Sequence, residues 1–434
     1  MSICGSTLST ARVLCGALLS CLWSCSDRSE GARLELWAVG REGEVVAELI
    51  RDFEATHPGI SVKVQRLPWL GAHEKLLTAV VGDATPDVAQ LGNTWIPEFA
   101  TIGALEPLDS GVRASASILE ADYFAGIWDT NRFENRQYGV PWYVDTRLLF
   151  YRRDLLAQAG FERPPQSWSE WLDMLRAIRE QSGPERAPLF QPLNEPEALL
   201  ALALQQEDPL LRDGDRFGNF RSQGFRRALE FYTNLFQTGL APHAGSMQVA
   251  NLWDEFARGA FVFFINGPWQ IAELERRLPA RLADSWMTAP LPGREGPGAS
   301  LAGGSSLVVF TRSARKREAW QLIEYLSRPE VQRRFYDLTG DLPPRRSSWA
   351  DSRLASDAHA VAFREQLERV EPTPKVPEWE RIKSEIAIVS ERVARGESSL
   401  EDAVAELDER ADRILEKRRW MLARQRPSSE PAAQ

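Results

Sequence analysis

The sequence predicts an α/β protein with two or more domains. Near the N-terminus, a strand pattern, an amphipathic helix pattern and a second strand pattern follow one another between residues 34 and 64. Later, short and wholly apolar runs at 261–265 and 307–310 are typical of buried strands. The 434 residues, of which 43% are hydrophobic and 26% charged, are enough for several packed domains. Repeated alternation of strands and helices is characteristic of α/β folds.

The first strand–helix–strand unit continues into a larger sheet. A turn at 40–43 precedes the first helix, which His57-Pro58-Gly59 ends. The next expected elements are a strand at 60–64, a helix at 72–82 and a strand at 86–91. Ligands of such sheets lie beyond the carboxyl ends of the strands. Topology therefore favours Glu42 and the segment Asn93-Thr94-Trp95 as ligand contacts.

The second half of the chain is mostly helical. Ser167 and Glu170 form a capping-box pattern, and Ser398 with Glu401 repeats it before a final helix. Segment 183–222 is rich in Pro, Gly and Asp and predicts loops. The other expected elements are helices at 223–238 and 249–258, the strand at 261–265, a Gly/Pro loop at 291–304, the strand at 307–310 and helices at 314–339. The tail at 426–434 is expected to be disordered.

The stretch 138–153 carries Trp142, Tyr143 and Asp145 directly before the apolar run 148–151. Aromatic faces, a hydroxyl and a carboxylate at the head of a buried strand suit a small polar ligand. The alternative is a core strand with aromatic packing. The residues alone leave these two interpretations open.

The ordered motifs of the mature chain resemble bacterial extracellular solute-binding protein family 1, the sugar-binding lipoproteins of ABC importers, of the maltose- and trehalose-binding kind. The motifs, in order, are His57-Pro58-Gly59-Ile60-Ser61-Val62, Thr85-Pro86-Asp87-Val88, the 138–153 stretch, Phe256-Ala257-Arg258-Gly259, Asn266-Gly267-Pro268-Trp269, Gly303-Gly304-Ser305-Ser306 and Thr339-Gly340-Asp341-Leu342-Pro343-Pro344. Each motif is weak alone, but their order over nearly the whole mature chain is a strong signal.

The resemblance implies a two-lobed periplasmic-binding-protein fold, type II-like, in which each lobe is a sheet flanked by helices and a hinge joins the lobes. The expected boundaries are 34–141 with 308–343 for the first lobe and 142–307 with 344–425 for the second. The implied function is to bind a carbohydrate, of di- or oligosaccharide size, between the lobes and to deliver it to an ABC permease. A monomer without cofactor is expected.

Sugars have apolar C–H faces and a rim of hydroxyls, so their sites need flat aromatic rings with carboxylates and amides. The expected ligand-binding residues are Glu42, Trp69, Asn93, Thr94, Trp95, Trp142, Tyr143, Asp145, Asn266, Trp269, Gly303, Gly304 and Arg345. Trp269, in Gly-Pro-Trp after a buried strand, is the best stacking platform.

Several of these residues have a structural alternative. Trp269 could cap the helix at 270–277, and Asp145 could have a purely structural role in an ion pair with Arg147. Glu42 could merely cap a helix through a favourable dipole interaction. Gly303 and Gly304 could allow close approach of the ligand or supply hinge freedom. Arg345 could reach the cleft from the second hinge or be a solvated surface arginine.

The first 25 residues have the layout of a secretory signal, with Arg12 before the apolar run 13–19. The segment Leu22-Trp23-Ser24-Cys25 resembles a lipobox, which implies lipidation of Cys25; Cys21 is a rival site, and Trp23 departs from the usual small residue. Residues 26–33 then read as a tether. No later stretch is apolar enough to span a bilayer. A lipid-anchored protein of the periplasm or cell envelope is therefore expected.

Other functions have weaker support. All four cysteines lie within the first 25 residues, and the four histidines are scattered, so no metal site is expected. A net charge of −9 disfavours nucleic acid. One rival is a glycoside hydrolase with Glu42 and Asp145 as its acid–base pair. The other is a ligand-binding receptor subunit of a membrane sensor, which would differ only in its partner.

Overall fold

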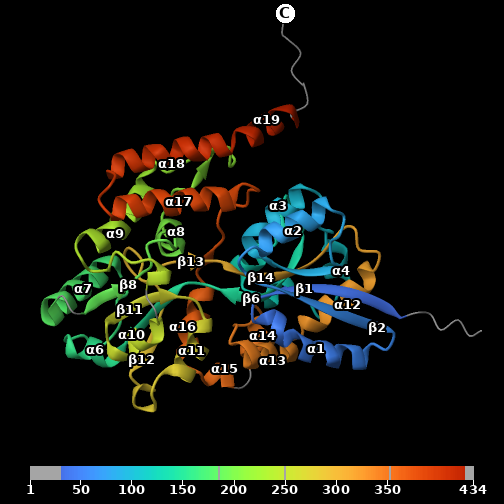
Figure 1. Cartoon of the computed structure of the whole chain (residues 1–434), viewed down its shortest axis with the longest axis horizontal. Helices are drawn as coiled ribbons and strands as arrows, with labels where there is room; N and C mark the ends of the chain where they lie inside the picture. The colour runs from blue at the N-terminus through green and yellow to red at the C-terminus, as the bar shows by residue number, and fades with distance from the viewer. Residues whose placement is uncertain (1–30, 184–185, 249–250, 351–352, 426–434) are drawn as a thin grey trace, which may run out of the picture.

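The computed structural model describes residues 31–183, 186–248, 251–350 and 353–425. Two β-sheets with flanking helices form two lobes that lie side by side (Figure 1). The expected signal segment, Cys21, Cys25, most of the tether and the tail at 426–434 lie outside the described residues. Within the described ranges, no helix is both long and apolar enough to cross a membrane.

The first lobe is built on a five-stranded sheet of order β2-β1-β3-β14-β6. Its strands are β1 (Ala32–Val39), β2 (Ile60–Leu67), β3 (Val88–Gly92), β6 (Gly139–Asp145) and β14 (Gly303–Val309). β1 pairs in parallel with β2 and β3, whereas β14 runs antiparallel to β3 and β6. The carboxyl ends of the three parallel strands therefore share one edge of the sheet.

Helices of the first lobe bury apolar stripes against this sheet. They include α1 (Glu42–Thr56), α2 (Ala72–Val81), α3 (Ile96–Thr101), α12 (Lys316–Leu326) and α13 (Pro329–Thr339), with the 3-10 turn η1 (Asn93–Trp95) between β3 and α3. In α1, Val46, Leu49, Ile50 and Phe53 are buried at helical spacing. The predicted first unit is thus confirmed.

The second lobe is built on a four-stranded sheet of order β12-β7-β11-β8. The strands are β7 (Leu148–Arg152), β8 (Ala187–Phe190), β11 (Phe261–Asn266) and β12 (Trp286–Ala289). Residues 261–265 are buried throughout, as the apolar run predicted. β11 delivers α11 (Trp269–Arg277) at its carboxyl end.

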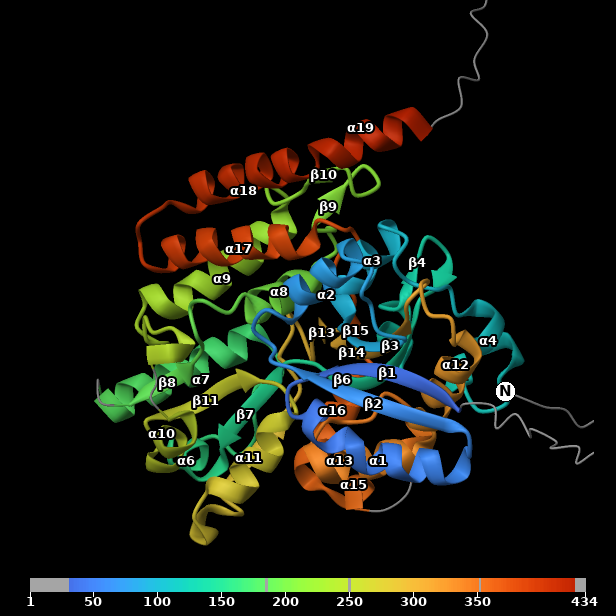
Figure 2. The ribbon, with the colours of Figure 1, turned by 45° about the vertical axis from the view of Figure 1, so that its right-hand side comes forward.

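A helical layer completes the second lobe. It consists of α7 (Trp168–Ser182), α8 (Glu197–Leu204), α9 (Gln223–Gln237), α17 (Trp379–Ala394) and α18 (Leu400–Ile414), followed by α19 (Glu416–Gln425). One apolar core joins α7, α8, α9, α17 and α18. Figures 1 and 2 both show α17 and α18 stacked at the same end of the molecule, above α9.

Three expectations about local structure need correction. Segment 183–222 is not only loop, because α8 lies within it with six consecutive buried residues from Ala198 to Ala203. The final capping residue is Ser399, whose side chain accepts from the Asp402 amide, one position later than predicted. The expected boundaries at 141/142 and 307/308 fall inside β6 and β14, since the first sheet includes Asp145 and Gly303.

Candidate functional site

A cleft of about 670 Å³ lies between the two lobes. Its first-lobe wall is the edge at which β1 and β3 end, together with neighbouring parts of β6 and β14. Its second-lobe wall comes from α8, α11 and α17. The cleft thus lies beyond the carboxyl ends of parallel strands, where α/β sheets hold their ligands.

The cleft brings together ten of the thirteen residues that the sequence predicted as ligand contacts. These are Glu42, Trp69, Asn93, Thr94, Trp95, Tyr143, Asp145, Trp269, Gly303 and Gly304.

Buried polar groups on the first-lobe wall form a hydrogen-bonded set around Tyr143. The Gln90 amide and the Ser305 hydroxyl donate to the Tyr143 hydroxyl oxygen over 3.2 and 3.0 Å. Burial raises the pKa of Tyr143 well above its usual value, so the hydroxyl keeps its proton and can donate to Glu42. Burial also raises the pKa of Glu42 and, more strongly, that of Asp341.

Asn93 presents an unused hydrogen-bond donor. Its Oδ1 accepts from the Ser306 hydroxyl over 2.9 Å, which fixes the orientation of the amide. Its Nδ2 is buried and has no partner within the described part of the chain. A buried donor without a partner costs about 1–3 kcal/mol of stability.

The second-lobe wall presents Trp269, the first residue of α11. The Arg147 guanidinium lies 4.9 Å from the Trp269 ring centroid and donates to Asp145 Oδ1 over 2.5 Å. The pairing that was the structural alternative for Asp145 is therefore present, although both members of the pair line the cleft. Burial raises the pKa of Asp145 despite the opposing effect of Arg147.

Glycines set the position of two cleft tryptophans. A Cβ on Gly267 would lie 2.0 Å from a Trp269 ring carbon, and one on Gly40 would lie 2.6 Å from Trp69 Nε1. Gly40 also has a φ of +65°, which other residues rarely adopt. Only glycine at these two positions allows the indole rings to fold back along the cleft wall.

Gly303 and Gly304 are required by strand pairing. A Cβ on Gly304 would lie 2.2 Å from the Tyr143 carbonyl oxygen, and one on Gly303 would lie 2.4 Å from that of Asp145. β14 and β6 change register nearby, between Ser305 and Ser306. The close approach of two backbones accounts for both glycines without a ligand, although both line the cleft.

Three predicted residues do not reach the cleft. Trp142 is 1% exposed and stacks on Phe335 at 4.4 Å, because successive strand residues face opposite ways and Tyr143 takes the cleft side. Arg345 is 5% exposed and is bound by Asp122 at 2.6 Å, so it is neither a cleft residue nor a solvated arginine. Asn266 lies outside the cleft lining, and its side chain accepts from the next backbone amide over 2.9 Å.

The sequence analysis missed several lining residues that come from helices. They include Glu197 and Leu200 on α8, Glu273 on α11, and Trp379, Glu380 and Lys383 on α17. Glu380 pairs with Lys383 at 2.8 Å and accepts from Thr94 across the cleft over 2.5 Å. No local signal marks the first turn of α17 as a wall of the cleft. Asp341, in contrast, belongs to the motif at 339–344, so the sequence did contain a signal for this lining residue.

Comparison with known proteins agrees with this architecture. The family model described as bacterial extracellular solute-binding protein matches residues 37–333. The solved structure of the sugar-binding protein MalE from Xanthomonas citri is 54% identical and superposes with a TM-score of 0.89, covering 91% of this chain and all of that one.

More distant relatives cover most of the chain as well. The diacetylchitobiose binding protein DasA from Streptomyces coelicolor is 26% identical over 366 residues, which are 83% of this chain and 84% of that protein. A solute-binding protein of Thermotoga lettingae, solved with α-D-tagatose, is 27% identical with a TM-score of 0.76, covering 88% of this chain and all of that one. The chain therefore belongs to the bacterial extracellular solute-binding protein family.

Proposed function

We propose that this protein binds a carbohydrate, of di- or oligosaccharide size, in the cleft between its lobes and delivers it to an ABC importer. The observation that carries the proposal is that tryptophans line both walls of the cleft. Trp69 and Trp95 lie on the first lobe, and Trp269 lies on the second; Trp379 borders the cleft from the second lobe, but its side chain is buried in the core of that lobe. Flat apolar faces on two sides suit the C–H faces of sugar rings.

The polar groups of the cleft suit hydroxyls. Six carboxylates and three basic side chains line it: Glu42, Asp145, Glu197, Glu273, Asp341 and Glu380, with Arg41, Arg147 and Lys383. Carboxylates accept hydrogen bonds from hydroxyls, and the guanidinium and ammonium groups donate them. A volume of about 670 Å³ lies within the usual range for small-molecule sites, about 300–1,000 Å³.

The names of similar proteins support the same ligand class. The Xanthomonas protein is called a sugar-binding protein, and the Streptomyces protein is named for diacetylchitobiose. A relative from Bacillus subtilis, 23% identical over 416 residues, is named a galactooligosaccharide-binding protein. The family is one of binding proteins rather than enzymes, so the glycoside-hydrolase alternative is not carried forward.

The proposed mechanism is hinge closure. A ligand that contacts both walls binds the closed arrangement better than the open one and shifts the population toward it. The Thr94–Glu380 hydrogen bond across the cleft would form only in that closed arrangement. Release would follow when the permease binds the closed protein and favours opening.

Membership of an extracellular family supports a location in the periplasm or cell envelope. We further propose a lipid anchor at Cys25 and a monomeric state. A role as receptor subunit for a membrane sensor would use the same cleft, and a permease gene beside this one would favour transport.

The test is a thermal-shift screen of the protein against mono- and oligosaccharides. A ligand that binds only the folded state must raise the melting temperature. We expect one sugar to raise it and Trp269→Ala to abolish that rise, whereas Trp420→Ala, an exposed tryptophan on α19, should preserve it. A rise with amino acids or polyamines and with no sugar would contradict the carbohydrate assignment.

A further inference from the structure

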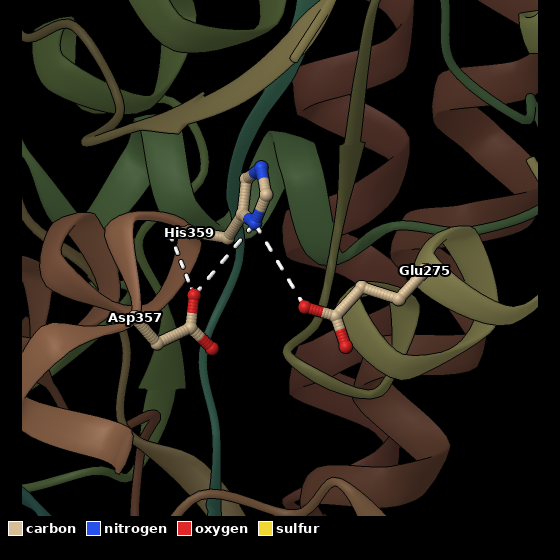
Figure 3. A group of neighbouring side chains, drawn as sticks. All are labelled: Glu275, Asp357 and His359. Carbon is tan, nitrogen blue, oxygen red and sulfur yellow. Dashed lines mark hydrogen bonds and ion pairs between the residues drawn. The ribbon is translucent and has the colours of Figure 1, made fainter. Parts of the chain in front are cut away.

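A second cluster of ligating side chains lies in the second lobe, outside the lining of the cleft. Glu275 is on α11, Asp357 precedes α16 (Ala358–Leu367), and His359 is on α16. One ligand atom from each of the three residues lies within 4.8 Å of the other two. Figure 3 shows His359 Nδ1 facing both carboxylates. From this geometry we propose that the three residues bind a divalent cation of the zinc class.

The orientation of His359 supports a metal. Its ring stacks on Trp286 with centroids 3.6 Å apart and an interplanar angle of 4°. Its Nε2 lies 3.3 Å from the Trp286 carbonyl oxygen, which can only accept, so Nε2 carries the proton. Nδ1 of the neutral ring then presents a lone pair. A histidine that donates one N–H to a carbonyl and offers its other nitrogen is the usual arrangement at metal centres.

The distances inside the cluster are too long for hydrogen bonds. Nδ1 lies 3.7 Å from Asp357 Oδ1 and 4.0 Å from Glu275 Oε1. Three electron-rich atoms facing one another repel unless a positive charge lies between them. Zn²⁺ bonds of about 2.0–2.2 Å in a tetrahedron separate neighbouring ligand atoms by about 3.3 Å. The exposed Glu275 side chain can move inward and so shorten its 4.0 Å separation from His359 Nδ1 to that value.

Asp357 is already positioned by its surroundings. Its Oδ1 accepts from the His359 amide over 2.8 Å as the cap of α16, and its Oδ2 accepts from the Tyr336 hydroxyl over 3.1 Å. Each carboxylate oxygen has a second lone pair for a metal. Such outer hydrogen bonds orient metal-binding carboxylates.

The ligand set selects the type of cation. Mg²⁺ and Ca²⁺ prefer sites made entirely of oxygen, whereas an imidazole with two carboxylates suits Zn²⁺ and its neighbours, with water as the fourth ligand. The scattered histidines gave no such expectation from sequence, because the ligands come from two helices far apart in the chain. The metal would tie α11, which begins with Trp269, to α16.

The test is a calorimetric titration of the EDTA-treated protein with zinc chloride at neutral pH, with a parallel thermal-shift measurement. We expect one Zn²⁺ per chain, a higher melting temperature and no response to Mg²⁺. Glu275→Gln should weaken binding at least tenfold, because it removes one of three protein ligands. Its side chain is exposed, so the fold should survive. His359→Ala should weaken binding at least as much.

The matched control is His57→Ala. His57 Nδ1 lies 3.0 Å from the Phe53 carbonyl oxygen, so this histidine should contribute nothing to zinc affinity. Equal zinc affinity in the parent protein and in Glu275→Gln would overturn the proposal. So would a dissociation constant weaker than roughly 100 μM, which corresponds to an adventitious surface contact. The outcome does not depend on the carbohydrate assignment.

Discussion

The two walls of the cleft hold their polar side chains in position in different ways. On the first lobe, Glu42, Asn93 and Tyr143 lie at or beside strands, and hydrogen bonds to the sheet hold their polar groups. On the second-lobe side, charged side chains are held in ion pairs: Lys383 pairs with Glu380 on α17, and Arg147, between β6 and β7, pairs with Asp145 at the end of β6. Groups fixed by a sheet are positioned before the ligand arrives, whereas paired charges can rearrange around it.

The largest effect is expected where a tryptophan belongs to a core rather than to a wall. Trp142 is fully buried against Phe335 in the first lobe, and Trp142→Ala should lower the free energy of unfolding by about 3–5 kcal/mol. Urea denaturation followed by circular dichroism measures this loss. Trp420→Ala, in contrast, should change stability by less than about 0.5 kcal/mol. A small loss for Trp142→Ala would show that the first-lobe core is loosely packed.

Trp269→Ala should separate binding from stability. The ring lies on the cleft wall beneath the Arg147 guanidinium, so its loss should weaken carbohydrate binding by about tenfold to a hundredfold. The free energy of unfolding should change far less than with Trp142→Ala, since Trp269 is only partly buried. Calorimetry with the sugar found in the screen measures the affinity. Unchanged affinity would show that Trp269 does not contact the ligand.

The sequence was informative where function follows local topology. The strand at 88–92 delivers Asn93 to Trp95, and the strand at 261–266 delivers Trp269, so strand ends alone identified these wall residues. Trp142 does not reach the cleft because side chains alternate in direction along β6. Arg345 does not reach it because its guanidinium forms an ion pair with Asp122. Neither effect is visible in a motif.

The helical half of the second wall could not be predicted in this way. α8 and α17 each show an apolar pattern that a buried helix explains completely. Their cleft residues are those at the helix ends, and only the packing of α17 against α9 and α18 brings these residues to the first lobe. The packing of α17 on α9 joins segments more than a hundred residues apart, and a single sequence gives no information on such contacts.

Two buried carboxylates of the first-lobe wall should differ in how strongly they respond when an amide replaces them. Burial holds the pKa of Asp341 well above its ordinary value, so the folded chain keeps a proton that the unfolded chain releases above about pH 4. Stability is therefore lost as pH rises toward the folded pKa. Asp341→Asn should raise the melting temperature at neutral pH by a few degrees, with a gain that vanishes near pH 4.

Asp145→Asn is the matched change at the carboxylate that pairs with Arg147. Burial raises the pKa of Asp145 as well, but the Arg147 guanidinium opposes that rise, so Asp145→Asn should raise the melting temperature at neutral pH by less than Asp341→Asn does. Melting curves of both variants between pH 4 and 8 give the comparison. An equal or larger gain in Asp145→Asn would mean that Arg147 does not stabilise the Asp145 carboxylate.

The smallest effect is expected for the single contact that joins the walls. The Thr94 hydroxyl donates to Glu380 across the cleft, and a hydrogen bond of this kind contributes about 1 kcal/mol. Thr94→Val keeps the shape of the side chain and should weaken ligand affinity by about fivefold. The variant should bind more weakly because it populates the open arrangement more. A contact between the two walls adds to ligand affinity only through the population of the closed state. Small-angle scattering of the ligand-free variant should then show a more open molecule. If the variant keeps the dimensions of the parent protein but binds the ligand more weakly, Thr94 is instead a direct ligand contact. Another contact between the two walls must then stabilise the closed arrangement.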